Sequence, residues 1–168
     1  SFGLFASNEG GTVRLIDAAK NRRQQPAQIA ESVRALLSRY GVTFDRLVNY
    51  HRLDNLIWVW NANAPNRNAG PYYDFYPGAQ YVDILAADIY GEFLQSHHDD
   101  LVELAQGKPV ALGEIGRPPS LETLKNQQKW VWFMGWSDIF DRKVTDAHKA
   151  LFQDSRTLSR GDKLPEGL

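Results

Sequence analysis

Four apolar runs divide the last two thirds of the chain, and each has the length of a buried β-strand; the second of them also carries Asp83 and Asp88. They cover residues 56–60, 82–90, 110–113 and 131–136. Runs without polar alternation are typical of strands in a parallel sheet that is covered on both faces. Helical spacing or a capping residue predicts helices at 97–106, from Ser120 onward, and at 145–153. Strands that alternate with helices in this way predict βαβ units and an α/β fold.

The spacing of these units favours a (β/α)8 barrel of the TIM type. From Trp60 to Asp88 is 28 positions, from Asp88 to Glu114 is 26, and from Glu114 to Trp136 is 22. A barrel of about 250 residues in eight units averages roughly 31 residues a unit. An open, doubly wound sheet fits the same period nearly as well, but the chain has no GxGxxG or phosphate-loop motif to favour it.

The first part of the chain has a weaker pattern. Pro26 followed by apolar residues at helical spacing predicts an amphipathic helix over 27–40, and a second helical piece over 44–51. Residues 61–78 are rich in Asn, Gly, Pro and Tyr and predict a long loop. The chain starts with Ser, so we expect a processed chain or a piece of a longer protein. We assign residues 1–168 to one domain and give no fold to residues 1–43.

The composition excludes several classes of partner. The net charge is −1, which argues against binding to nucleic acid or to an anionic membrane. There are no cysteines, so neither disulfides nor thiolate metal sites can form. Aromatic residues make up 12% of the chain, and Trp and Tyr rings suit both cores and sugar platforms. We therefore expect no nucleic acid, no membrane and no metal.

Polar and aromatic residues gather where the predicted strands end. They are Trp60, Asn61, Asp88, Tyr90, Glu114 and Trp136. Because parallel barrels carry their active sites at the carboxyl ends of the strands, we expect these side chains to share one site. Gly113 and Gly116 flank Glu114 and leave room for a ligand near its carboxylate. Asp88 and Tyr90 alternate along a strand and face the same side, so the phenol can hold a carboxylate.

Each of these residues also has a plainer interpretation. On spacing alone, a strand-end glutamate in a salt bridge explains Glu114 better than catalysis, and Tyr90 is equally well a core residue. Trp58 and Trp132 have the pattern of core side chains. The run at 97–100, His-His-Asp-Asp, fits a solvated helix face better than a metal site, because adjacent helical residues point apart.

Six groups of residues, in a fixed order and spacing, carry a family resemblance. They are Phe44-Asp45-Arg46-Leu47-Val48, Asn55-Leu56-Ile57-Trp58-Val59-Trp60-Asn61, Tyr76-Pro77-Gly78 with Tyr81-Val82-Asp83-Ile84, Asp88-Ile89-Tyr90, Gly113-Glu114-Ile115-Gly116, and Trp130-Val131-Trp132-Phe133-Met134-Gly135-Trp136. Together they resemble glycoside hydrolase family 26, the β-mannanase-type family of the large retaining (β/α)8 clan. The resemblance extends from about residue 44 to about residue 158.

The resemblance implies a partial barrel of strands five to eight, preceded by the unassigned N-terminal segment. It implies that Glu114 is the catalytic nucleophile at the end of strand seven. Asp88 and Tyr90 match the pair on strand six that contacts the sugar and the nucleophile. Trp136 matches the aromatic residue under the subsite next to the scissile bond. Ser137 departs from the Asn or Gly often found there, which leaves the detail of that subsite open.

The general acid has no clear match. The family places it in a His-Glu motif at the end of strand four, and the chain has no such motif. Glu9, in Asn8-Glu9-Gly10, lies at a plausible distance upstream, but the aromatic stretch that should follow it is missing. The acid is therefore Glu9 or a residue outside this chain.

The resemblance implies a secreted or periplasmic retaining glycosidase that cleaves β-1,4-linked mannan or a related neutral polysaccharide without any cofactor. A xylanase or mixed-linkage glucanase on the same fold is a second reading, and a non-catalytic carbohydrate-binding piece is a third. Half a barrel also leaves open sheet edges, so self-association that completes the barrel is a further expectation.

Overall fold

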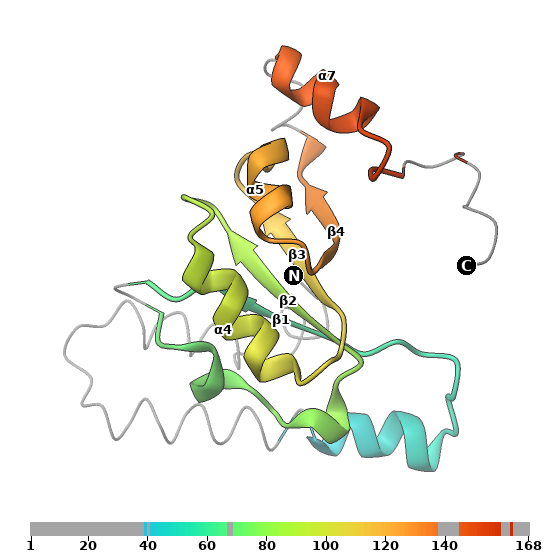
Figure 1. The fold of residues 1–168 in the computed structure, drawn as a ribbon. Coiled ribbons are helices and arrows are strands. Elements are labelled where there is room, and N and C mark those ends of the chain that lie inside the picture. Colours follow the sequence, from blue (N-terminus) through green and yellow to red (C-terminus); the bar gives the residue numbers. More distant parts are fainter. Residues whose placement is uncertain (1–38, 40, 67–68, 138–144, 159–161, 163–168) are drawn as a thin grey trace.

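The computed structural model describes residues 39, 41–66, 69–137, 145–158 and 162, and these contain one four-stranded parallel sheet (Figure 1). The strands lie in chain order, β1-β2-β3-β4. Their bounds are Val59–Asn63 for β1, Ile84–Ile89 for β2, Val110–Ile115 for β3 and Trp130–Gly135 for β4. Helix α4 (Gln95–Ala105) follows β2, α5 (Leu121–Asn126) follows β3, and α7 (Asp146–Gln153) follows β4.

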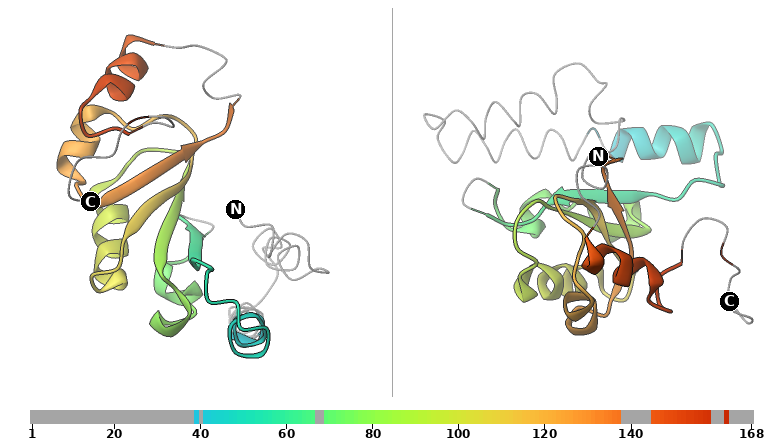
Figure 2. Two further views of the ribbon diagram at one scale, coloured as in Figure 1. Left: turned by 90° about the vertical axis from the view of Figure 1, so that its right-hand side faces the viewer. Right: turned by 90° about the horizontal axis from the view of Figure 1, so that it is seen from above.

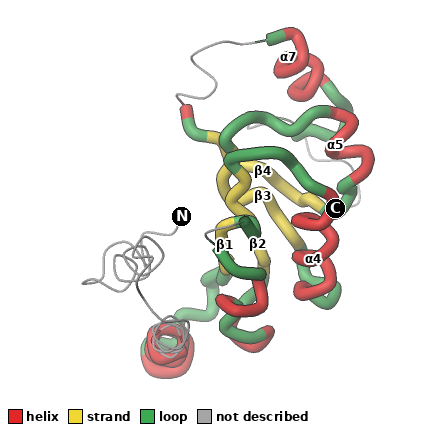
Figure 3. Tube along the Cα trace, turned by 90° about the vertical axis from the view of Figure 1, so that its left-hand side faces the viewer, coloured by secondary structure: helices red, strands yellow, loops and turns green. Residues whose placement is uncertain are grey.

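The placement of the helices decides between the two predicted architectures. Helices α4 and α5 lie on the same side of the strands, as Figure 2 and Figure 3 show from opposite directions. A doubly wound sheet has helices on both faces, whereas a (β/α) barrel has all of them outside. Sequential parallel strands with helices on one face are therefore a section of a barrel, and the predicted α/β barrel fold is confirmed.

The core lies between the two central strands and α4. All six residues of β3 are buried, and Leu85 and Ile89 of β2 are almost inaccessible. Leu101 on α4 packs into the same cluster. Residues buried on both sides of a strand need no polar alternation, and this explains the continuous apolar runs in the sequence.

The edge strand β4 differs from the centre. Val131, Trp132 and Met134 are exposed to 57%, 36% and 36%. The prediction that Trp132 is a core residue is wrong, because in the described part of the chain β4 has a neighbouring strand on one side only. In the other edge strand the ladder begins later than the apolar run suggests, since Leu56 and Ile57 are exposed and Val59 is the first residue paired with β2. Asn61 therefore lies inside a strand and not in the loop after it.

The connections follow the predicted local signals closely. Ser120 caps α5, and its Oγ accepts a hydrogen bond from the Thr123 backbone N–H at 3.0 Å. The helical piece expected over 44–51 contains a π-helix, η1 (Arg46–Tyr50). The loop between β1 and β2 holds two short 3-10 helices, η2 (Tyr72–Phe75) and η3 (Ala79–Tyr81). The helix expected over 27–40 falls almost wholly outside the described residues. Within the described part of the chain, no helix is both long and apolar enough to cross a bilayer.

Candidate active site

Three predicted site residues from three neighbouring strands form one hydrogen-bonded chain. Tyr90, which directly follows β2, donates its phenol to Glu114 Oε2 on β3 at 2.6 Å. Trp136, which directly follows β4, donates its indole Nε1–H to the Tyr90 oxygen at 2.7 Å. Glu114 is 5% exposed, whereas Tyr90 and Trp136 are 57% and 48% exposed. A nearly buried carboxylate therefore lies beneath two accessible aromatic rings at the carboxyl ends of the strands.

Gly116 allows this close approach between the ends of β2 and β3. A Cβ atom at position 116 would lie 2.9 Å from Tyr90 Cα and 3.0 Å from the Tyr90 carbonyl oxygen. The Gly116 backbone N–H also donates to Ile89 O at 2.9 Å, which extends the ladder one step past the strands. The absence of a side chain at position 116 lets the Tyr90 backbone come near enough for its ring to reach Glu114.

Asp88 is the third residue of the site on this side of the sheet, since it lies in β2 two positions before Tyr90. It pairs in register with Glu114, directly after a register shift between Ala87 and Asp88. Asn61 on β1 donates its Nδ2–H to Asp88 Oδ1 at 2.7 Å. The structure thus brings together Asn61, Asp88, Tyr90, Glu114 and Trp136, five of the residues predicted to share a site.

The pKa values of the two carboxyl groups are shifted in opposite directions. Burial raises the pKa of Asp88 to about 6, the charge of Glu114 adds to the increase, and the hydrogen bond from Asn61 opposes it. Burial also acts to raise the pKa of Glu114, but this pKa is lowered overall, and the hydrogen bond from the Tyr90 phenol contributes to the decrease. The pKa of Tyr90 is raised by burial and by its bond to Glu114, so the phenol remains a proton donor at neutral pH. Two carboxyl groups with different surroundings are typical of catalytic sites.

Trp60 does not join this group. Its side chain is 6% exposed, and its Nε1–H donates to Phe75 O at 3.1 Å. The ring packs edge-on against Tyr76, with centroids 5.2 Å apart, and against Tyr72 at 6.3 Å. The structure therefore places Trp60 in the hydrophobic core and not on the accessible side of the site. Glu9, the candidate general acid, lies outside the described residues.

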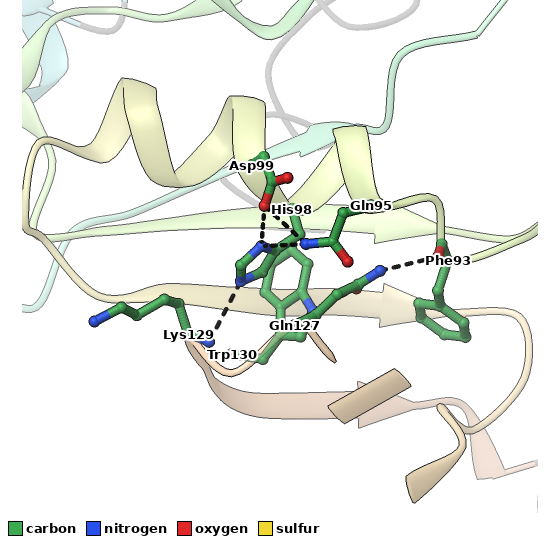
Figure 4. Close-up of polar contacts among 7 residues, drawn as sticks. All are labelled: Phe93, Gln95, His98, Asp99, Gln127, Lys129 and Trp130. Atoms are coloured by element: carbon green, nitrogen blue, oxygen red, sulfur yellow. Dashed lines mark hydrogen bonds and ion pairs between the residues drawn. The ribbon is translucent and has the colours of Figure 1, made fainter. Parts of the chain in front are cut away.

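A second polar cluster joins α4 to the start of β4 (Figure 4). His98 is 6% exposed, so the expectation of a solvated face at 97–100 is wrong for this residue. The ring nitrogen Nδ1 lies 2.7 Å from Asp99 Oδ1, and the other ring nitrogen, Nε2, accepts a hydrogen bond from the Lys129 backbone N–H at 3.3 Å. The ring also packs edge-on against Trp130, with centroids 5.1 Å apart. The cluster has the geometry of a structural joint, and among the described residues no group of acidic, His or Cys side chains is arranged to hold a metal.

Gln127 completes this joint, and the sequence pattern did not predict it. Its Oε1 accepts from Trp130 Nε1–H at 2.9 Å, and its Nε2 donates to Phe93 O at 2.9 Å. Gln127 is 3% exposed, unusual for an amide side chain. No local periodicity marks such a residue, because one of its partners, Phe93, lies 34 positions away along the chain. Both hydrogen bonds of the Gln127 amide therefore join a donor to an acceptor.

The profile of glycosyl hydrolase family 26 matches residues 27–162. The chain therefore belongs to glycosyl hydrolase family 26, and its sheet is part of the barrel of that family.

Two curated relatives with a named activity match part of the chain. The chain is similar to a mannan endo-1,4-beta-mannosidase of Thermothelomyces thermophilus, 38% identical over 106 residues, which are 60% of this chain and 20% of that protein. It is 32% identical over 142 residues to a mannan endo-1,4-beta-mannosidase of Bacillus subtilis strain 168, covering 75% of this chain and 38% of the relative. The chain thus spans well under half the length of these curated relatives.

Solved structures match the same region. GH26A from Muricauda sp. MAR_2010_75 superimposes with a TM-score of 0.69 at 46% identity, covering 73% of this chain and 42% of that one. The Bacillus subtilis mannanase BCman superimposes with a TM-score of 0.67 at 26% identity, covering 88% of this chain and 45% of that one. The likeness therefore extends over less than half of each of these two chains.

Proposed function

We propose that this chain is the part of a retaining β-mannanase that supplies the nucleophile, Glu114. The observation that carries the proposal is the hydrogen-bonded chain from Trp136 through Tyr90 to Glu114 at the carboxyl ends of three barrel strands. Two of the compared relatives are named mannan endo-1,4-beta-mannosidases, and this supports mannan as the substrate. The exposed rings of Tyr90 and Trp136 are suitable surfaces for a pyranose.

The mechanism needs two carboxyl groups about 5–5.5 Å apart across the glycosidic bond. A Glu114 oxygen attacks the anomeric carbon, and the bond to the leaving-group oxygen breaks as the general acid protonates that oxygen. Water, deprotonated by the same second group, then releases the sugar from Glu114. The phenol of Tyr90 holds the Glu114 carboxylate in its ionised form and fixes its orientation through Oε2.

The second carboxyl group is Glu9 or a residue outside this chain, and this part of the proposal is still a prediction. The mechanism uses no metal or organic cofactor. Because a polysaccharide does not cross a bilayer, we also propose that the protein acts outside the cytoplasm. Among the described residues β1 and β4 are the edge strands of the sheet, and this supports assembly with another half-barrel, either a second copy or a further part of the same protein.

A substrate whose leaving group needs no acid tests Glu114 separately from the missing acid. A 2-deoxy-2-fluoro-β-mannosyl fluoride loses fluoride without protonation, and the 2-fluorine slows hydrolysis of the glycosyl-enzyme. We expect the label to appear by peptide mass spectrometry on the Glu114 carboxylate. Glu114→Gln abolishes labelling, and Glu92→Gln, a change at an exposed glutamate nearby, leaves it intact. Labelling elsewhere, or full mannan hydrolysis by an otherwise active protein with Glu114→Gln, contradicts the assignment.

A second candidate function is carbohydrate binding without hydrolysis, and the exposed rings of Tyr90 and Trp136 favour it. It predicts binding of manno-oligosaccharides with no release of reducing sugar and no covalent label. The same assays on mannan, xylan and mixed-linkage glucan separate a mannanase from a xylanase or a glucanase. They are made on this chain and on the longest protein that its reading frame encodes.

A further inference from the structure

The Asn61 side chain occupies an unusual place on the site face of the sheet. It starts from the middle of β1, opposite Ala86 of β2, and reaches forward to donate its Nδ2–H to Asp88 Oδ1 at 2.7 Å. Its other amide atom, Oδ1, is buried and has no hydrogen-bond partner among the described residues. A buried acceptor without a partner costs stability, so a compensating reason for this amide is expected.

The amide lies directly against the backbone of Gly113, two strands away. A Cβ atom at position 113 would be 2.1 Å from Asn61 Oδ1, 2.6 Å from Cγ and 2.9 Å from Nδ2. Real Cβ atoms essentially never approach this closely. The small side chain of Ala86, on the strand between them, lets the amide extend this far across the sheet.

The ladder between β2 and β3 explains why Gly113 is available. Ala87 pairs with Leu112 and Asp88 pairs with Glu114, so Gly113 is the extra residue at the register shift. Irregularities of this kind reorient side chains next to active sites. The shift brings Asp88 level with Glu114, and the space over Gly113 holds the amide that contacts Asp88.

We propose that Asn61 is a positioning residue for Asp88, and that position 113 is glycine because the Asn61 amide fills the space that any larger side chain would need. The amide faces Asp88 with its N–H because an ionised carboxylate only accepts hydrogen bonds. The bond fixes the Asp88 carboxylate beside Glu114 and favours its charged form. Only the consequence for catalysis rests on the proposed function. The geometric claim does not.

A double-mutant cycle tests the shared space. Gly113→Ala forces the amide away, so we expect it to lower the folded-to-unfolded ratio by more than about tenfold at a fixed urea concentration. In Asn61→Ala the space is empty, and the same methyl group fits. Gly113→Ala in that background then lowers the ratio by less than about threefold, which is a clear departure from additivity.

The titration of Asp88 tests the positioning role. Aspartate carboxyl carbons are labelled with carbon-13, and the Asp88 resonance is identified by its loss in Asp88→Asn. Without the amide donor the charged form is less favoured, so Asn61→Ala moves the Asp88 midpoint to higher pH. Asn61→Asp, which keeps the shape but adds a like charge, moves it further in the same direction. Asn49→Ala is the matched control, because it removes an exposed amide-to-carboxylate bond, Asn49 Nδ2 to Asp45 Oδ1 at 3.1 Å.

Two results would overturn the proposal. One is an equal cost of Gly113→Ala with and without Asn61, and the other is an Asp88 midpoint that does not move in Asn61→Ala. If Gly113→Ala alone does not fold, the double variant decides: folding supports the proposal, and a double variant that fails while Asn61→Ala folds contradicts it. Neither measurement uses mannan, so loss of the proposed enzymatic function leaves this inference standing, and the reverse also holds.

Discussion

The polar cluster around His98 and the candidate active site around Glu114 differ in how well their polar groups are paired. At the joint of His98, Gln127 and Trp130, side chains are hydrogen-bonded to the backbone or to one another. At the site, two carboxyl groups lie side by side on adjacent strands, and burial raises the pKa of Asp88 to about 6. The first arrangement serves stability alone. The second keeps like charges together and an Asn61 oxygen that has no partner among the described residues, which a purely structural cluster avoids.

Of the changes that test this difference between the clusters, His98→Ala has the largest expected effect, a loss of stability. The change removes a buried ring and leaves the Lys129 N–H and one face of Trp130 without their partner. Together these predict about 2–4 kcal/mol of lost unfolding free energy. Urea unfolding measures it, with His51→Ala, at an exposed histidine, as the control. If His98→Ala costs no more than His51→Ala, the joint does not have the structural role assigned to it.

Tyr90→Phe acts on the other cluster and is expected to affect activity more than folding. It removes the hydrogen bond to Glu114 Oε2 and the acceptor for Trp136. We expect kcat to fall about 10- to 100-fold, the value of one strong charge-assisted bond. In the unmodified protein this hydrogen bond lowers the pKa of Glu114. Its loss therefore raises that pKa, and the acidic limb of the pH–rate profile moves to higher pH.

Initial rates of mannan hydrolysis across pH measure this effect, with Tyr73→Phe at a 70% exposed tyrosine as the control. An unchanged acidic limb with reduced kcat would show that Tyr90 acts on the substrate and not through Glu114.

The smallest expected effect is a gain of stability from Asp88→Asn at neutral pH. The folded-state pKa of Asp88 lies above its unfolded value, so the folded chain binds the proton more tightly between about pH 4 and 6. The wild-type protein therefore loses stability as pH rises through this range, and the penalty persists at pH 7. After allowance for solvent screening, Asp88→Asn gains about 1–2 kcal/mol at pH 7 relative to its effect at pH 4.

Urea unfolding at both pH values measures the difference, with Asp54→Asn at an exposed position as the reference. If Asp88→Asn lowers the stability at pH 7 while Asp54→Asn does not, the charged form of Asp88 stabilises the fold. Asp88 would then have a structural role like that of His98.

Some of the site could be predicted because strand ends are visible in a single sequence. Asp88, Tyr90, Glu114 and Trp136 each end or follow an apolar run, and the parallel topology brings such ends together. Trp60 has the same sequence signal and a different outcome. Its ring turns into the core against Tyr76, because side chains of adjacent strand residues point to opposite faces and the ladder begins later than the apolar run.

The sequence by itself determined the alternation of strands and helices, the parallel sheet, and the positions of the carboxylates and aromatic rings along it. These follow from local periodicity and from which residues end each run. Only the tertiary structure decided that the helices share one face, that the indole of Trp136 reaches Tyr90, and that the Asn61 amide lies against Gly113. Such contacts join residues tens of positions apart, and their geometry depends on strand register, which no local pattern encodes.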